Sequence, residues 1–116
     1  MISDAADGIM DAQRMLRIKM TGRWNKQTNE AALSLLRTNL EKMGATSISY
    51  GDDGGAVKAL QAGLNRFGMN LIIDGRFGVS TQAALVTFQV KNSLPVDAIA
   101  DEDEEPAIFD DLIGHW

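Results

Sequence analysis

The chain has 116 residues, no cysteine and a formal net charge of −5, with 45% hydrophobic and only 6% aromatic residues. This length supports one modest core, which Leu, Ile, Val, Ala and Met must fill. The lack of cysteine excludes disulfides, thiolate nucleophiles and cysteine-based zinc sites. No apolar run approaches the roughly 20 residues that a membrane span needs, so no membrane insertion is expected.

The charge is unevenly distributed along the chain. Residues 97–116 hold eight of the sixteen acidic residues and no Lys or Arg. The first 96 residues keep the other eight acids and all eleven bases, so their formal charge is +3 (11 − 8) and that of the last twenty is −8. Such asymmetry bears on partners rather than on fold.

The N-terminal half predicts two helices joined by a turn. Residues 1–8 contain neither a basic nor an apolar segment, so no signal peptide is predicted. A short helical pattern runs from Ile9 to Leu16, and a turn follows at residues 21–25. The next helix is expected to begin near Asn25, a good N-cap residue, and to continue to a stop at Gly44. Residues 46–55 predict a linker with one short extended segment.

The second half repeats this organisation. Val57, Leu60, Leu64 and Phe67 have helical spacing, and Gly68 is a natural stop. After a brief extended piece at residues 71–73, the stretch 74–78 predicts a tight turn that leads directly into a helix over Thr81–Gln89. Gly75 is expected at a positive φ, because a Cβ is unfavourable there, and Phe77 is expected to pack back against the helices.

The two halves align residue by residue around their turns. The Gly22–Trp24 turn parallels Gly75–Phe77, and in each half a Thr lies four residues after the aromatic residue. These parallels favour a degenerate internal repeat, with chance similarity between helical hairpins as the alternative. The predicted organisation is therefore an N-terminal helical half (1–50), a second helical module (51–100) and an acidic C-terminal segment (101–116).

The ordered pattern over residues 51–97 resembles the peptidoglycan-binding domain family, the small three-helix modules that accompany many cell-wall hydrolases. The residues that carry the resemblance are Gly51, Val57, Leu60, Gln61, Leu64, Gly68, Asp74, Gly75, Phe77, Gly78, Thr81, Ala84, Phe88, Gln89, Leu94 and Asp97. The resemblance implies an all-α fold of two related helical hairpins. This chain departs from the family where a second Asp-Gly turn is usual, because Ala98 follows Asp97.

The C-terminal segment combines five adjacent acids, 101–105, with an apolar face. The acids repel one another and predict a solvated, mobile stretch. A short amphipathic helix is then expected, with one face made of Ile108, Phe109, Leu112, Ile113 and Trp116. We expect that face to pack on the chain's own core. The alternative is that it binds a groove on a protein partner.

The residue inventory argues against an enzyme. The one histidine, His115, lies next to the C-terminus, which is a poor position for a preorganised site. Glu30 and Glu41 lie about 16 Å apart along one helix, too far to form a glycosidase pair. The sequence predicts no catalytic residue, no cofactor and no metal site. Nucleic-acid binding is not expected either, since the few basic residues near Trp24 compete with an acidic tail.

A binding site at the second turn is the remaining hypothesis. The resemblance implies peptidoglycan as the ligand, and the candidate residues are Asp74, Gly75, Arg76, Phe77, Thr81, Gln61 and Gln89, with Arg23 and Trp24 at the equivalent turn. Arg76 is the strongest single candidate for ligand contact, whereas Phe77 fits a core role better. With no signal peptide predicted, a phage-related wall-binding protein is expected. The rival hypothesis is a structural or decoration protein of a virion that uses the same fold for assembly.

Overall fold

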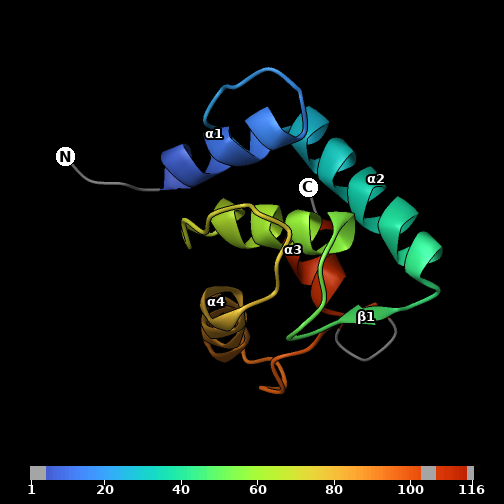
Figure 1. Cartoon of the computed structure of the whole chain (residues 1–116). Coiled ribbons are helices and arrows are strands. Elements are labelled where there is room, and N and C mark those ends of the chain that lie inside the picture. The colour runs from blue at the N-terminus through green and yellow to red at the C-terminus, as the bar shows by residue number, and fades with distance from the viewer. Residues whose placement is uncertain (1–4, 103–106, 115–116) are drawn as a thin grey trace.

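The computed structural model describes residues 5–102 and 107–114, and helices dominate these ranges (Figure 1). The predicted all-α fold is confirmed. The elements in chain order are α1 (Ala5–Met15), α2 (Lys26–Met43), β1 (Ser47–Ile48), α3 (Gly55–Arg66), α4 (Val79–Lys91), β2 (Ala100–Asp101) and the π-helix η1 (Asp110–Gly114).

Helix α3 is the centre of the structure. Nine of its twelve residues are buried, which is the pattern of a helix surrounded by protein rather than exposed on one face. Helices α1 and α2 cover one side of it, and α4 and η1 pack against it from other directions (Figure 1). The second half of the chain therefore depends on the first half for cover.

The limits of α2 follow from local chemistry at both ends. The side chain of Asn25 caps the helix, because its Oδ1 accepts a hydrogen bond from the backbone N–H of Thr28 at 2.8 Å. At the other end Gly44 adopts φ 64°, a left-handed conformation that glycine adopts without steric cost. Both predicted boundaries are confirmed.

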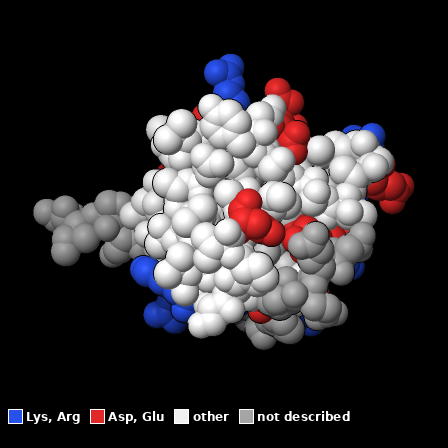
Figure 2. All heavy atoms as spheres, turned by 90° about the horizontal axis from the view of Figure 1, so that it is seen from below, with Lys and Arg blue, Asp and Glu red and all other residues white. Residues whose placement is uncertain are grey.

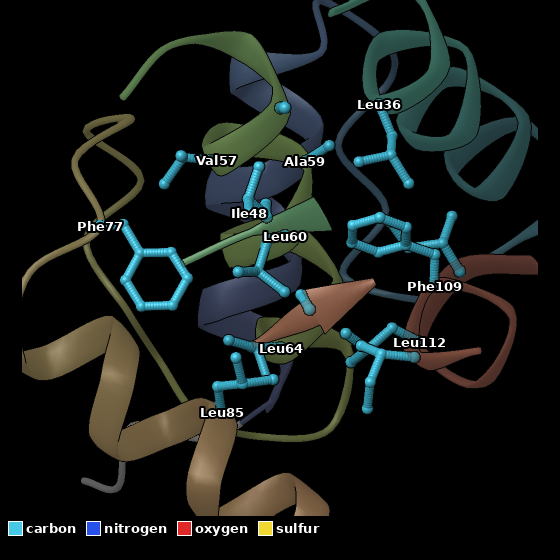
Figure 3. Packing of buried hydrophobic residues seen from close by; sticks show 14 of the residues in the cluster. Leu36, Ile48, Val57, Ala59, Leu60, Leu64, Phe77, Leu85, Phe109 and Leu112 are labelled. Atoms are coloured by element: carbon cyan, nitrogen blue, oxygen red, sulfur yellow. The ribbon is translucent and has the colours of Figure 1, made fainter. Parts of the chain in front are cut away.

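One hydrophobic core includes side chains from α2, α3, α4, both short strands and the C-terminal segment. Leu60 and Leu64 of α3 lie between Phe77 and Leu85 on one side and Leu36, Phe109 and Leu112 on the other (Figure 3). The buried Phe77 confirms the prediction that this aromatic residue packs back onto the helices. The two halves therefore share one core instead of forming two separate ones.

A two-stranded antiparallel sheet joins the linker to the end of the second module. Ser47 pairs with Asp101 and Ile48 with Ala100, so the predicted extended segment of the linker is confirmed. No strand forms over residues 71–73, in agreement with the prediction of a brief extended piece rather than a sheet strand. Asp101 is 6% exposed, and the prediction of a solvated segment is wrong for this residue because it is paired in β2. Residues 103–105 lie outside the described ranges.

The C-terminal segment packs on the chain's own core. Ile108 and Phe109 are each 3% exposed, and Leu112 and Ile113 are fully buried. The alternative of a protein partner on this face is therefore wrong for these four residues, and Trp116 lies outside the described ranges. Gly63 permits the close packing, because a Cβ at that position would lie 3.0 Å from the Cγ1 of Ile113.

We predict that Leu112→Ala lowers the free energy of unfolding by about 2–5 kcal/mol, because it leaves a cavity at a fully buried position. Chemical denaturation of the full chain measures this change. Val96→Ala is the control, since Val96 is 56% exposed and its truncation should cost less than about 0.5 kcal/mol. Equal denaturation midpoints for Leu112→Ala and the parent would contradict the packing of η1.

Candidate functional site

The buried side chain of Gln61 holds the second turn in place. Its Nε2 donates to the Oδ1 of Asp74 at 3.1 Å, to the backbone oxygen of Arg76 at 3.1 Å and to the Oγ1 of Thr81 at 3.0 Å. Its Oε1 accepts from the backbone N–H of Gly75 at 3.0 Å. An amide nitrogen has two hydrogens, so one of them is shared between acceptors. A single residue thus ties α3 to the turn and to the start of α4.

Asp74 has a structural role within its own turn. Its Oδ1 also accepts a hydrogen bond from the backbone N–H of Arg76 at 2.9 Å. This bond, followed by the one from Gln61, lowers the pKa of the Asp74 carboxyl below its ordinary value. The carboxylate is therefore ionised at neutral pH, and it remains exposed to solvent beside the exposed side chain of Arg76.

The turn also pairs with the linker that precedes α3. The backbone N–H of Gly54 donates to the oxygen of Gly75 at 2.8 Å, and the N–H of Phe77 donates to the oxygen of Asp52 at 2.9 Å. Gly75 has φ 77°, as predicted, and a Cβ there would lie 3.2 Å from the backbone oxygen of Gly54. Conformation and space both favour glycine at this position.

A pocket of about 580 Å³ opens beside this turn. Three segments form its walls: the α3–α4 connection, the turn itself and the first turn of α4, where the N-cap residue has no side chain to cap the helix. The lining residues are Gln61, Met69, Asn70, Leu71, Ile72, Asp74, Arg76, Gly78, Val79, Ser80 and Thr81. Acidic, basic, hydroxyl and apolar side chains thus surround one concave surface.

Asn65 fixes the wall formed by the α3–α4 connection. Its Oδ1 accepts from the backbone N–H of Leu71 at 2.6 Å, and its Nδ2 donates to the backbone oxygen of Leu71 at 3.0 Å. Asn65 is not among the site residues predicted from the sequence. The available signal was a second amide one helical turn after Gln61, in a helix that is otherwise apolar on that face.

The first half contains an equivalent glutamine. The Nε2 of Gln13 donates to the Oγ1 of Thr21, the backbone oxygen of Arg23 and the Oγ1 of Thr28 at 3.0, 3.0 and 2.9 Å. Its Oε1 accepts from the N–H of Gly22, which has φ 76°. These bonds correspond to those of Gln61, and they support the internal repeat that the sequence suggested.

The equivalent turn does not have the same pocket wall. Gln13 lies eight residues before Thr21, whereas Gln61 lies thirteen before Asp74. The five additional residues in the second half lie in the connection that supplies Met69–Ile72 to the pocket. Arg23 is exposed at the first turn, but the shorter connection there does not supply a segment equivalent to Met69–Ile72.

Trp24 packs against the protein and is not a fully exposed ring. It is half-buried, and its Nε1 donates to the Oδ1 of Asn29 at 2.9 Å. The guanidinium of Arg66 lies 5.7 Å from the centre of the Trp24 ring and 5.1 Å from that of Phe67, a cation–π arrangement. Burial lowers the pKa of Arg66 from its usual value. Trp24 thus links the first turn to the end of α3.

Gln89 belongs to a third turn that the sequence analysis did not identify. Its Nε2 donates to the Oδ1 of Asp97 and the oxygen of Ile99, both at 3.1 Å, and its Oε1 accepts from the N–H of Ala98 at 3.1 Å. Ala98 has φ 58°, so it holds the conformation that a glycine would adopt more easily. The sequence signal for this turn was the eight-residue spacing between Gln89 and Asp97, which equals the spacing between Gln13 and Thr21.

Of the nine predicted site residues, four line the pocket: Gln61, Asp74, Arg76 and Thr81. Gly75 lies in the turn beside them and is bonded to Gln61. Phe77 is in the core, and Gln89, Arg23 and Trp24 belong to the other two turns. Among the described residues, no three His, Cys, Asp or Glu side chains gather where they could hold a metal ion. No helix within the described ranges combines the length and apolar character of a membrane span.

Residues 53–104 match the family model described as "Putative peptidoglycan binding domain". The match contains α3, the second turn and α4, and so includes every residue that lines the pocket. The resemblance found over residues 51–97 is confirmed. No curated protein and no solved structure matches the chain.

We predict that Gly75→Val destabilises the protein by more than about 1 kcal/mol, because a β-branched residue is strained at φ 77° and its Cβ approaches the oxygen of Gly54. Denaturant titration measures the loss. Gly44→Val gives the comparison, since a Cβ at Gly44 meets nothing within 4 Å and only the conformational cost applies. A smaller loss at Gly75 than at Gly44 would disprove the steric argument.

We predict the opposite sign for Ala98→Gly. Removing the Cβ relieves an L-residue held at φ 58°, and the gain of about 0.5–1 kcal/mol remains after the greater entropy of glycine in the unfolded chain. A rise in the melting temperature checks this outcome. Ala83→Gly in the middle of α4 should instead destabilise the protein by about 0.5–1 kcal/mol. If both substitutions change the free energy of unfolding in the same direction, Ala98 is not strained by its positive φ.

Proposed function

We propose that the chain binds bacterial peptidoglycan without cleaving it, and that the stem peptide enters the pocket beside the second turn. The observation that supports this most directly is the position of the pocket. All of its lining residues fall within residues 53–104, the segment that matches the peptidoglycan-binding family model. In the other two glutamine-held turns the glutamine lies eight residues before its first partner in the turn, whereas Gln61 lies thirteen before Asp74, so the connection that walls this pocket is longer.

The charges at the pocket suit the stem peptide. A stem peptide offers carboxylates, amides and an amino group, and a guanidinium binds a carboxylate through charge-assisted hydrogen bonds. Arg76 is exposed at the rim, so it can make such a contact without breaking any bond that holds the turn. The carboxylate of Asp74 lies at the same edge, where its remaining oxygen can accept from an amino group.

The apolar part of the lining suits the short aliphatic side chains of a stem peptide. Ile72 is 81% exposed and Val79 is 72% exposed, and both contribute to the pocket. Burying such groups against methyl and methylene groups of a ligand contributes about 25 cal/mol per Å² of apolar surface removed from water. The pocket thus combines an ionic contact with an apolar one.

We predict that Arg76→Ala weakens the binding of purified sacculi about tenfold or more, because a charge-assisted contact contributes roughly 1.5–3 kcal/mol. The stability should change by less than about 0.5 kcal/mol, since the side chain is exposed. A co-sedimentation titration with sacculi measures the binding, and thermal unfolding measures the stability.

Arg23→Ala is the matched control for this experiment. Arg23 occupies the equivalent place in the first turn, is also exposed and carries the same charge, so its loss reproduces any general electrostatic effect on binding to the wall. We expect it to leave binding within about twofold of the parent. If Arg23→Ala loses sacculus binding while Arg76→Ala retains it, the ligand binds at the first turn. No binding by the parent would favour the rival role in particle assembly.

A further inference from the structure

A stripe of apolar side chains runs along the solvent-facing side of α4. Val79, Ala83, Val86 and Val90 follow one another at spacings of four, three and four residues, which places them on one face of the helix. Val79 is 72% exposed and Val90 is 60% exposed; Ala83 is exposed and Val86 is half-buried. The opposite face packs on the core through Thr81, Ala84, Leu85, Phe88 and Gln89.

The surroundings of this stripe are uncharged. Ser80, Gln82 and Thr87 flank it, and the first charge on α4 is Lys91 at its last position. Figure 2 views the molecule from below, the side on which α4 lies in Figure 1. Uncharged atoms fill most of this face, with Lys and Arg toward its edges and some Asp and Glu atoms nearer its middle. An exposed apolar surface of this kind marks an interaction site more often than an isolated exposed residue does.

The spacing of the stripe indicates what kind of surface would fit it. Steps of four and three residues are those of the a and d positions of a coiled coil, where helices pack with their axes nearly aligned. The order four, three, four also reads the same in both directions along the helix. A second α4 placed antiparallel therefore brings Val79 opposite Val90 and Ala83 opposite Val86, with all four positions in register at once.

We propose that a second copy of this chain packs on the stripe, with the two α4 helices antiparallel about a two-fold axis between residues 84 and 85. A two-fold interface uses the same surface on both partners, and this stripe is complementary to itself in spacing and in the absence of charge. Each copy carries a net charge of −5, so contact through a neutral face avoids the repulsion between like charges that other faces would meet.

The pairing places the partner next to the pocket. Val79 belongs both to the stripe and to the pocket lining, so the partner's Val90 would lie at the pocket rim. Because a contact of only two helical repeats is small, the dimer is expected to be a weak one. The inference does not rest on peptidoglycan binding, since it concerns only the association of the chain with itself.

Sedimentation equilibrium of the full chain, from micromolar concentrations to about 1 mM, tests the proposal. We expect the mass to rise above 12.6 kDa toward twice that value as concentration increases. Val79→Glu and Val90→Lys should each raise the dissociation constant at least about tenfold, because each places a charge against an apolar partner residue. The double variant should have a dissociation constant within about threefold of the parent's, since each Glu then faces the partner's Lys.

The variants control for net charge and for folding. The two single variants shift the net charge in opposite directions, and the double variant leaves it unchanged. A general effect of net charge therefore cannot weaken dimerisation in both single variants. A Glu at the start of α4 and a Lys at its end suit the helix dipole, and equal melting temperatures will show that the monomer is intact.

Tyr50→Lys alters a 58% exposed residue outside α4 and should leave dimerisation unchanged. A parent that stays monomeric at about 1 mM overturns the proposal. Dimerisation of both single variants at the level of the parent overturns it too. A folded double variant that stays monomeric overturns the antiparallel register.

Discussion

Buried amide groups determine how this small protein is assembled. Gln13, Gln61 and Gln89 are each 1% exposed or less, and a buried amide that loses its hydrogen-bond partners costs roughly 1–3 kcal/mol. Each glutamine finds its partners in the turn that follows its own helix. The turn must therefore fold back onto the helix in one conformation, and it carries the next segment of chain with it.

The same constraint explains the unusual residues at the turns. In all three cases a residue with positive φ donates its backbone N–H to the glutamine: Gly22, Gly75 and Ala98. Two of these are glycines, which adopt the conformation freely. At the third, the bonds to Gln89 hold an alanine in the same conformation, which shows that the side-chain bonds dictate the turn even where the residue is a poor fit.

Helix α4 connects the three properties that we assign to the second half. Its inner face completes the core, its first turn lines the pocket, and its outer face carries the neutral stripe. Val79 takes part in both the pocket and the stripe because it is the first residue of the helix and its side chain is exposed. A dimer through α4 would thus bring two pockets into one assembly and allow two contacts with one polymer, a source of avidity.

The sequence by itself determined the presence of the main helices, both ends of α2 and the identity of the second turn. These features depend on local chemistry: apolar spacing, an Asn cap before α2, and glycines where φ is positive. The same local signals identified Gln61, Asp74, Arg76 and Thr81 as a group. Family resemblance added the ligand class, because no single residue type in the turn specifies peptidoglycan.

Only the tertiary structure decided which surfaces are covered. The periodicity of the C-terminal segment showed an apolar face but not its partner, and packing against Gly63 settled this in favour of the chain's own core. Asp101 was read as part of a solvated acidic run, yet strand pairing with Ser47 buries it. The pocket and the exposure of the stripe on α4 likewise depend on contacts between segments far apart in the chain, and spacing along a sequence does not show which helix face those contacts leave uncovered.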